Sequence, residues 1–93
     1  FNGDIKMKKN DIISISWLDQ NSYHQQTDGA GALTKAHGIT IGYLLEEDEE
    51  WICIASERMK FVGFAGYQYR HVVSIPKCCI TKSTILKKAT KED

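Results

Sequence analysis

The feature that most constrains this chain is a set of short runs in which apolar and polar side chains alternate. Along residues 12–18, Ile13, Ile15 and Trp17 fall on one face and the intervening serines fall on the other. A period of two residues is typical of a β-strand with one buried face. Helical periodicity is scarce elsewhere in the chain. The pattern therefore predicts an all-β fold whose first strand covers residues 12–18.

Two further β-rich runs, residues 39–45 and 51–56, are separated only by the acidic residues 46–50. The short separation predicts a hairpin with the acidic run at its tip. Adjacent like charges repel one another and need water, so an exposed tip suits them and discourages pairing with another sheet edge. Capture of a hard cation is the alternative, but the run lacks the spacing and the central glycine of a calcium loop.

A later strand is predicted at residues 67–75, where the alternation returns. Pro76 ends this strand because proline cannot donate to a ladder. Residues 59–66 are expected to form a loop or a short strand, and residues 80–86 a short last strand. The side chains expected to share the core face are Tyr67, Tyr69, His71, Val73 and Ile75. Arg70 is expected to point outward.

The chain has 93 residues, which is enough for one modest core but not for two domains. The strand pattern predicts a small antiparallel barrel of about five strands over residues 7–88, with one long loop at residues 19–35. Such loops are more often functional or mobile than idle, and a disordered connector is the alternative. We expect residues 1–6 to be a cloning remnant and residues 89–93 to be a frayed tail.

The charges balance, with twelve basic and twelve acidic side chains. A duplex-binding surface normally shows a strong basic excess, so nucleic acid is possible as a partner but not favoured. A net charge of zero also means that copies of the protein do not repel one another through a common net charge, so self-association is not opposed. No apolar run approaches the ~18 residues that span a bilayer, and the first residues lack the apolar stretch and the small-residue cleavage site of a signal peptide, so we expect a soluble protein without a membrane partner.

The three cysteines, Cys53, Cys78 and Cys79, are an odd number and are predicted to be reduced thiols. A buried strand cysteine such as Cys53 usually behaves as a small apolar residue. The chain has no Cys-x-x-Cys pair, and its histidines are scattered singly. We therefore predict no metal, no cofactor and no catalytic residue, and expect that the protein is not an enzyme.

The favoured contact surface lies where the first strand opens into the long loop. Its candidate residues are Trp17, Asp19, Tyr23 and His24. Tryptophan and tyrosine supply large, rigid contact areas that suit a partner. The alternative for Trp17 is that it is the last core residue of its strand, as its period suggests.

A diffuse anion site is a second possibility. The segment Gly29-Ala30-Gly31 lacks the glycine spacing and the downstream lysine of a P-loop. Backbone amides of such a loop can nevertheless bind phosphate when cationic side chains are near. Lys35, His37 and Arg70 are the candidates, and we include His37 and Arg70 among the predicted binding residues.

Single-stranded nucleic acid is the alternative ligand, because small barrels bind it through basic grooves and stacking aromatics. Tyr67, Tyr69, Arg70 and His71 have the right chemistry. Tyr67, Tyr69 and His71 share the predicted core face, however, so packing is the better explanation for that part of the group.

The segment Ser74-Ile75-Pro76-Lys77-Cys78-Cys79-Ile80 resembles the end of SH3-like barrels, where a strand runs into a proline-led 3₁₀ turn and a short last strand. This resemblance implies an SH3-like or Sm-like barrel. It does not extend to proline-rich peptide recognition, since the acidic and aromatic motif of the first strand is missing. The turn also has cysteines where a ligand-contacting tyrosine would be expected.

Four segments give the whole layout: Ser16-Trp17-Leu18-Asp19, Gly42-Tyr43-Leu44-Leu45-Glu46-Glu47, Ile52-Cys53-Ile54-Ala55-Ser56 and Ile75-Pro76-Lys77-Cys78-Cys79-Ile80. From residue 12 to residue 86, this layout resembles short accessory proteins of tailed bacteriophages and prophages. The resemblance implies a bacteriophage setting and a small barrel, and it transfers no catalytic residue. By analogy with other accessory proteins of this size, we expect a non-enzymatic counter-defence inhibitor in the host cytoplasm that binds a host defence protein or sequesters a signalling nucleotide. The acidic run and the late lysines also permit a homo-oligomer.

Overall fold

The structure is a computed structural model that describes residues 6–19 and 36–90. Its elements are β1 (Ile12–Asp19), β2 (Ala36–Glu47), β3 (Trp51–Met59), β4 (Gln68–Pro76), the 3₁₀ turn η2 (Lys77–Cys79) and β5 (Ile80–Lys87). The strands form one antiparallel sheet in the order β4-β3-β2-β1-β5. The prediction of a small antiparallel all-β fold with five strands is confirmed. In the described parts of the chain, no helix is long and apolar enough to cross a membrane.

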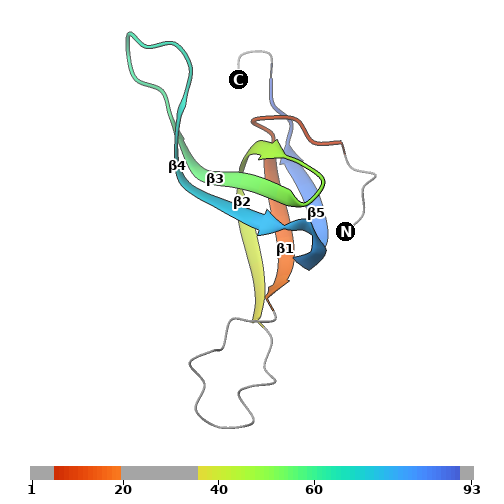
Figure 1. Cartoon of the computed structure of the whole chain (residues 1–93). Helices are drawn as coiled ribbons and strands as arrows, with labels where there is room; N and C mark the ends of the chain where they lie inside the picture. Colours follow the sequence, from red (N-terminus) through yellow and green to blue (C-terminus); the bar gives the residue numbers. More distant parts are fainter. Residues whose placement is uncertain (1–5, 20–35, 91–93) are drawn as a thin grey trace, which may run out of the picture.

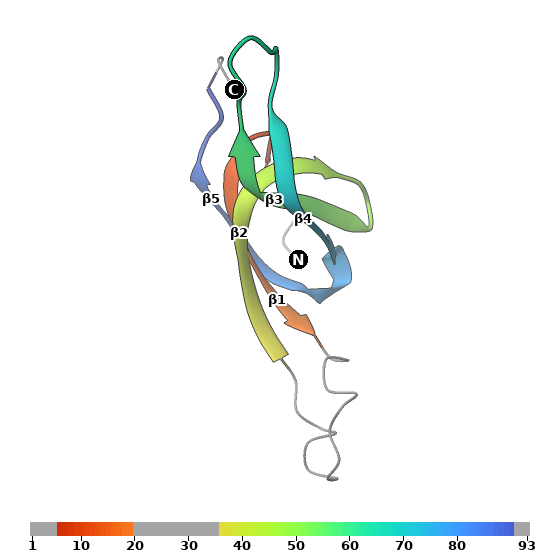
Figure 2. The same cartoon turned by 90° about the vertical axis from the view of Figure 1, so that its left-hand side faces the viewer.

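The sheet is strongly curled, so that strands from its two ends approach each other (Figures 1 and 2). β2 is the longest strand, and it pairs with β1 along one part of its length and with β3 along the other. β4 and β5 are the two edges of the sheet, and η2 joins them directly. The proline-led turn expected at the end of an SH3-like barrel is therefore present. No ladder joins β4 to β5 within the described ranges.

The core lies inside this curl and is built mainly from isoleucine. Its buried members are Ile13, Ile15, Leu44, Ile52, Ile54, Ile75 and Ile80, with Met7, Trp17 and Ile85 packed against them. The predicted alternation of the first strand is confirmed, since both core isoleucines of β1 are fully buried. Burial of one such side chain contributes roughly 1.5 to 3 kcal/mol, so the strand period accounts for much of the stability of this small domain.

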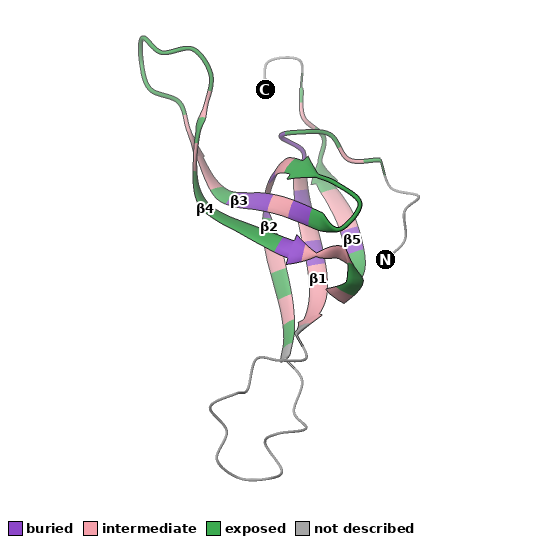
Figure 3. Cartoon of the chain, in the orientation of Figure 1, coloured by how far each residue is buried: buried purple, intermediate pink, exposed green. Residues whose placement is uncertain are grey.

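The prediction that alternate residues from Tyr67 to Ile75 share a core face is wrong. Among them only Ile75 is buried, whereas His71 and Val73 are exposed. His71 has a φ of 57°, in the left-handed region, which interrupts the regular alternation of side chains along the strand. The hairpin of β3 and β4 also projects beyond the other strands, where no core lies beneath it (Figures 1 and 3).

The acidic run lies at the tip of the β2–β3 hairpin, as predicted: Glu46 and Glu47 end β2, residues 48–50 form the turn, and all five residues are exposed. The turn is ordered by Asp48, whose Oδ1 accepts the backbone N–H groups of Glu50 and Trp51, both at 2.8 Å. These two hydrogen bonds lower the pKa of Asp48 below its ordinary value of 3.8, since they favour the charged carboxylate.

The base of this turn is tied to η2. Lys77 Nζ lies 3.0 Å from Glu47 Oε2, and both side chains are partly buried. The backbone N–H of Lys77 also donates to the carbonyl of Glu50 at 2.7 Å. The acidic turn is therefore held beside the proline-led turn, although the two are far apart in the sequence.

Candidate functional site

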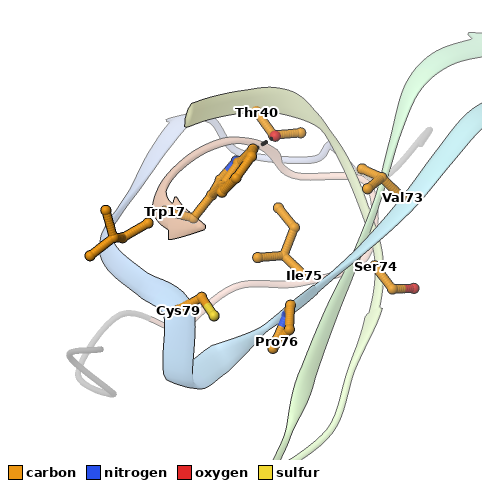
Figure 4. A pocket seen from close by; sticks show the side chains of 8 residues that line it. Trp17, Thr40, Val73, Ser74, Ile75, Pro76 and Cys79 are labelled. Carbon is orange, nitrogen blue, oxygen red and sulfur yellow. Dashed lines mark hydrogen bonds between the residues drawn. The ribbon is translucent and has the colours of Figure 1, made fainter. Parts of the chain in front are cut away.

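A pocket of about 350 Å³ opens where the ends of β1 and β2 face β4 and η2 (Figure 4). Its lining residues are Trp17, Leu18, Thr40, Val73, Ser74, Ile75, Pro76 and Cys79. In Figure 4 the side chain of Ile75 points into the space between Trp17 and Val73. Pockets of about 300 Å³ or more that are mainly apolar with a few polar groups are typical ligand sites.

Trp17 forms one wall of the pocket and is held in place from two sides. Its Nε1–H donates to Thr40 Oγ1 at 2.9 Å. Its ring lies against Gly38, the residue opposite it on β2, where an added Cβ would come within 2.2 Å of the ring. Glycine at this position lets the indole approach the backbone of β2 closely. Trp17 both packs against the core and faces the pocket, so its two predicted roles are compatible.

The chemistry of the pocket is apolar. No charged side chain is among its described lining residues, and the hydroxyl of Thr40 already accepts a hydrogen bond from Trp17. Such a site suits an aliphatic or aromatic group, because burying a charge here without a partner would cost free energy.

A smaller depression of about 180 Å³ adjoins the pocket across β4. Its lining residues are Glu46, Glu47, Asp48, Trp51, Cys53 and Ser74. Ser74 lines both hollows, and its side chain points away from the centre of the apolar pocket (Figure 4). An apolar socket and an acidic patch therefore lie side by side on this molecule.

Of the predicted site residues that the structure describes, Trp17 is the one that lines the pocket. Asp19 is the last residue of β1, and Tyr23 and His24 lie outside the described residues. His37 is exposed near the start of β2 and does not line the pocket.

Of the predicted anion site, the described residues include only Arg70 and His37. Arg70 lies on β4, where it pairs with Glu57 across the ladder at 3.8 Å. His37 lies near the start of β2, where it pairs with Leu18 of β1. The glycine loop and Lys35 fall outside the described residues.

The other pocket residues were missed because they come from distant segments. The sequence pattern indicates Thr40 only as a strand residue, and Val73 and Ile75 only as core residues. The resemblance of residues 74–80 to the end of an SH3-like barrel was the one signal that could have indicated this wall. This resemblance indicates the turn but not the residues of the other strands that the turn faces.

The three cysteines form no disulfide with one another. The Sγ atoms of Cys78 and Cys79 are 3.9 Å apart, well beyond a bond length of about 2.05 Å. Among the residues that the structure describes, no three His, Cys, Asp or Glu side chains gather as a metal site would require.

Cations lie over tyrosine rings near the loop end of the β3–β4 hairpin. The Arg58 guanidinium lies 4.4 Å from the ring centroid of Tyr43 and 4.0 Å from that of Tyr67. Lys60 Nζ lies 5.8 Å from the Tyr67 centroid. At these distances the cations are attracted to the ring faces, so the Tyr67 ring is already engaged within the chain.

Comparison of the chain with protein-family models, curated proteins and solved structures finds no match.

Proposed function

We propose that the protein is a non-enzymatic binding protein whose pocket beside Trp17 takes an apolar side chain of a protein partner. The observation that carries this proposal is the apolar pocket of about 350 Å³, whose tryptophan wall is held by Thr40 and Gly38. Large apolar anchors seated in such pockets contribute much of the affinity of protein interfaces.

A protein partner fits this pocket better than a signalling nucleotide. A nucleotide carries phosphate groups, which need cations or a set of backbone N–H donors. The described lining contains no cation, and the neighbouring depression is formed by Glu46, Glu47 and Asp48. This negative patch would repel phosphate and would attract a partner whose apolar anchor is flanked by lysine or arginine.

The biological setting that we propose is counter-defence by a bacteriophage in the host cytoplasm, with a host defence protein as the partner. The support for this setting is the resemblance of residues 12–86 to bacteriophage accessory proteins. The pocket supplies the chemistry of binding.

Binding of single-stranded nucleic acid is the second candidate, favoured by the gathering of Arg58, Lys60 and Lys9 around Tyr67 and Tyr69. Against it, cations already lie over the tyrosine rings on which bases would stack. Retention of single-stranded DNA or RNA at low salt that weakens steeply with added salt would support this candidate. Absence of retention at low salt would exclude it.

The proposal is tested with short synthetic peptides that hold one phenylalanine flanked by lysines. Binding is followed by the NMR shift of the Trp17 indole N–H. Val73 lines the pocket and is 42% exposed, and Val72 beside it is 51% exposed but does not line the pocket. Val73→Arg should therefore weaken peptide binding at least about tenfold, since a charge in the socket costs more than about 1.4 kcal/mol.

Val72→Arg is the matched control and should bind the peptides as the unaltered protein does. The proposal is wrong if the Trp17 signal does not move at millimolar peptide, or if the two arginine variants weaken binding equally.

A further inference from the structure

The projecting end of the β3–β4 hairpin carries large apolar side chains that are exposed among the described residues. Phe64 is 72% exposed, Val62 is fully exposed and Phe61 is half exposed. We call these three residues the apolar tip. Large aromatic side chains standing out on a hairpin are uncommon on a monomeric surface and mark an interaction site when they are grouped.

The local sequence forces this exposure. The backbone N–H of Phe64 donates to the carbonyl of Phe61 at 3.2 Å, which closes a tight turn. Gly63 is the third residue of this turn and has a φ of 86°, which glycine adopts without steric cost. The turn is too short for its own side chains to cover one another, so Val62 and Phe64 stand outward.

Basic side chains outnumber acidic ones in the part of the hairpin around the apolar tip. From residue 57 to residue 71 the hairpin contains Arg58, Lys60 and Arg70 against the single carboxylate of Glu57. Lys60 directly precedes the apolar tip and is exposed. The tip is thus an apolar anchor with positive flanks, which is the chemistry that the pocket and its acidic neighbour complement.

We propose that the apolar tip of one copy of this protein docks into the Trp17 pocket of a second copy, with Phe64 as the anchor and Lys60 facing the acidic turn. This inference rests on the proposed function of the pocket and names a second copy of the chain as one of its partners. The fit in size is sufficient, since a cavity of about 150 Å³ already holds benzene and the pocket measures about 350 Å³.

The contact must be between two copies because the tip does not reach the pocket of its own chain. The apolar tip lies before Gln68, whereas the pocket uses residues 73–76 at the far end of the same strand. Five strand positions separate residues 68 and 73, a distance of about 17 Å. Because β4 is paired with β3 along this length, it stays extended and keeps the apolar tip away from the pocket.

A contact between two different surfaces of identical chains is heterologous, and it repeats until a ring closes or a filament grows. This geometry allows a sharp test. A copy without its anchor still has a pocket, and a copy with a blocked pocket still has its anchor. Two such variants, each unable to associate with itself, should form one contact with each other and stop at a dimer.

The experiment measures mass by sedimentation velocity over a range of protein concentrations. We expect the unaltered protein to associate, and Phe64→Ser and Val73→Arg each to weaken association at least tenfold. Mixing these two variants should restore association to a one-to-one dimer with nothing larger. Ile41→Ser removes an exposed apolar side chain from β2, away from the tip, and Val72→Arg adds the same charge beside the pocket, so both controls should associate normally.

The inference is overturned if the unaltered protein stays monomeric at millimolar concentration, if the mixed variants stay monomeric, or if Ile41→Ser weakens association as much as Phe64→Ser. Binding of the unaltered protein to lipid vesicles through Phe64, with no association between copies, would also overturn it. The lysine-flanked phenylalanine peptide separates the two proposals. If the peptide still shifts the Trp17 signal of Phe64→Ser while the unaltered protein stays monomeric, the pocket is a binding site. In that case only the proposal that a second copy of the chain occupies it is wrong.

Discussion

At the scale of single residues, the carboxylate of Asp11 joins the beginning and the end of the described domain. Asp11 is fully buried. Its Oδ2 accepts the backbone N–H of Lys8 at 2.8 Å, and its Oδ1 accepts that of Ala89 at 2.7 Å. Its backbone carbonyl accepts the N–H of Leu44 at 2.9 Å. No pattern in the sequence indicated this role, because the donors are backbone groups brought together by folding.

Asp11→Ala should destabilise the fold by about 2 to 4 kcal/mol, because two backbone N–H groups lose a charged acceptor in a buried site. The measurement is urea unfolding followed by tryptophan fluorescence. Glu49→Ala removes an exposed carboxylate and should stay within about 0.5 kcal/mol of the unaltered protein. Equal stabilities of the two variants would contradict this role of Asp11.

At the scale of elements, the two hairpins on β3 differ in what holds them. The β2–β3 turn is organised by Asp48 and is tied to η2 through Lys77. The far end of the β3–β4 hairpin has an exposed apolar tip and a left-handed residue, His71, in its second strand. The first hairpin thus supports the pocket wall, whereas the second extends away from the body of the sheet (Figure 2).

The contribution of Asp48 to stability should depend on pH. Its pKa is lowered on folding, so the carboxylate form stabilises the turn above the unfolded value near 3.8. This stabilisation is lost as the pH falls through the lower folded pKa. The difference in Tm between the unaltered protein and Asp48→Ala should therefore be constant near neutral pH and shrink in acid.

Glu49→Ala is again the control, and its Tm should track that of the unaltered protein across this range. A difference for Asp48→Ala that stays the same in strong acid would show that the side chain acts through packing and not through its charge.

At the scale of the whole molecule, a net charge of zero hides an uneven distribution. Residues 46–50 are five adjacent acids, whereas the β3–β4 hairpin has more cations than carboxylates. The acidic turn lies beside the apolar pocket and the cations lie beside the apolar tip. Opposite charges therefore accompany the two apolar surfaces that we propose to meet.

Association between copies should accordingly weaken as salt is added. Raising the ionic strength from about 0.01 M to about 1 M shortens the screening length from about 30 Å to about 3 Å. We expect the dissociation constant measured by sedimentation to rise about tenfold, which corresponds to a loss of about 1.4 kcal/mol from screened charge pairs. A dissociation constant that stays the same or falls as salt is added would show that apolar contacts alone hold the copies together.

The sequence alone determined the class of fold and most of the strands. The period of two residues in residues 12–18 placed Ile13 and Ile15 in the core, because a pleated strand with one buried face allows no other arrangement. The acidic run marked a hairpin turn, since five like charges need water. Pro76 marked the end of β4, because its nitrogen has no proton to donate.

Only the tertiary structure decided which residues form the pocket. Trp17, Thr40 and Val73 come from three strands, and the curl of the sheet brings the ends of β1 and β2 opposite the β4 edge. The exposure of Val73 was likewise decided by β4 lying at the edge of the sheet and by the left-handed φ of His71. Periodicity describes the two faces of a strand, but whether a face is covered depends on which strands lie over it.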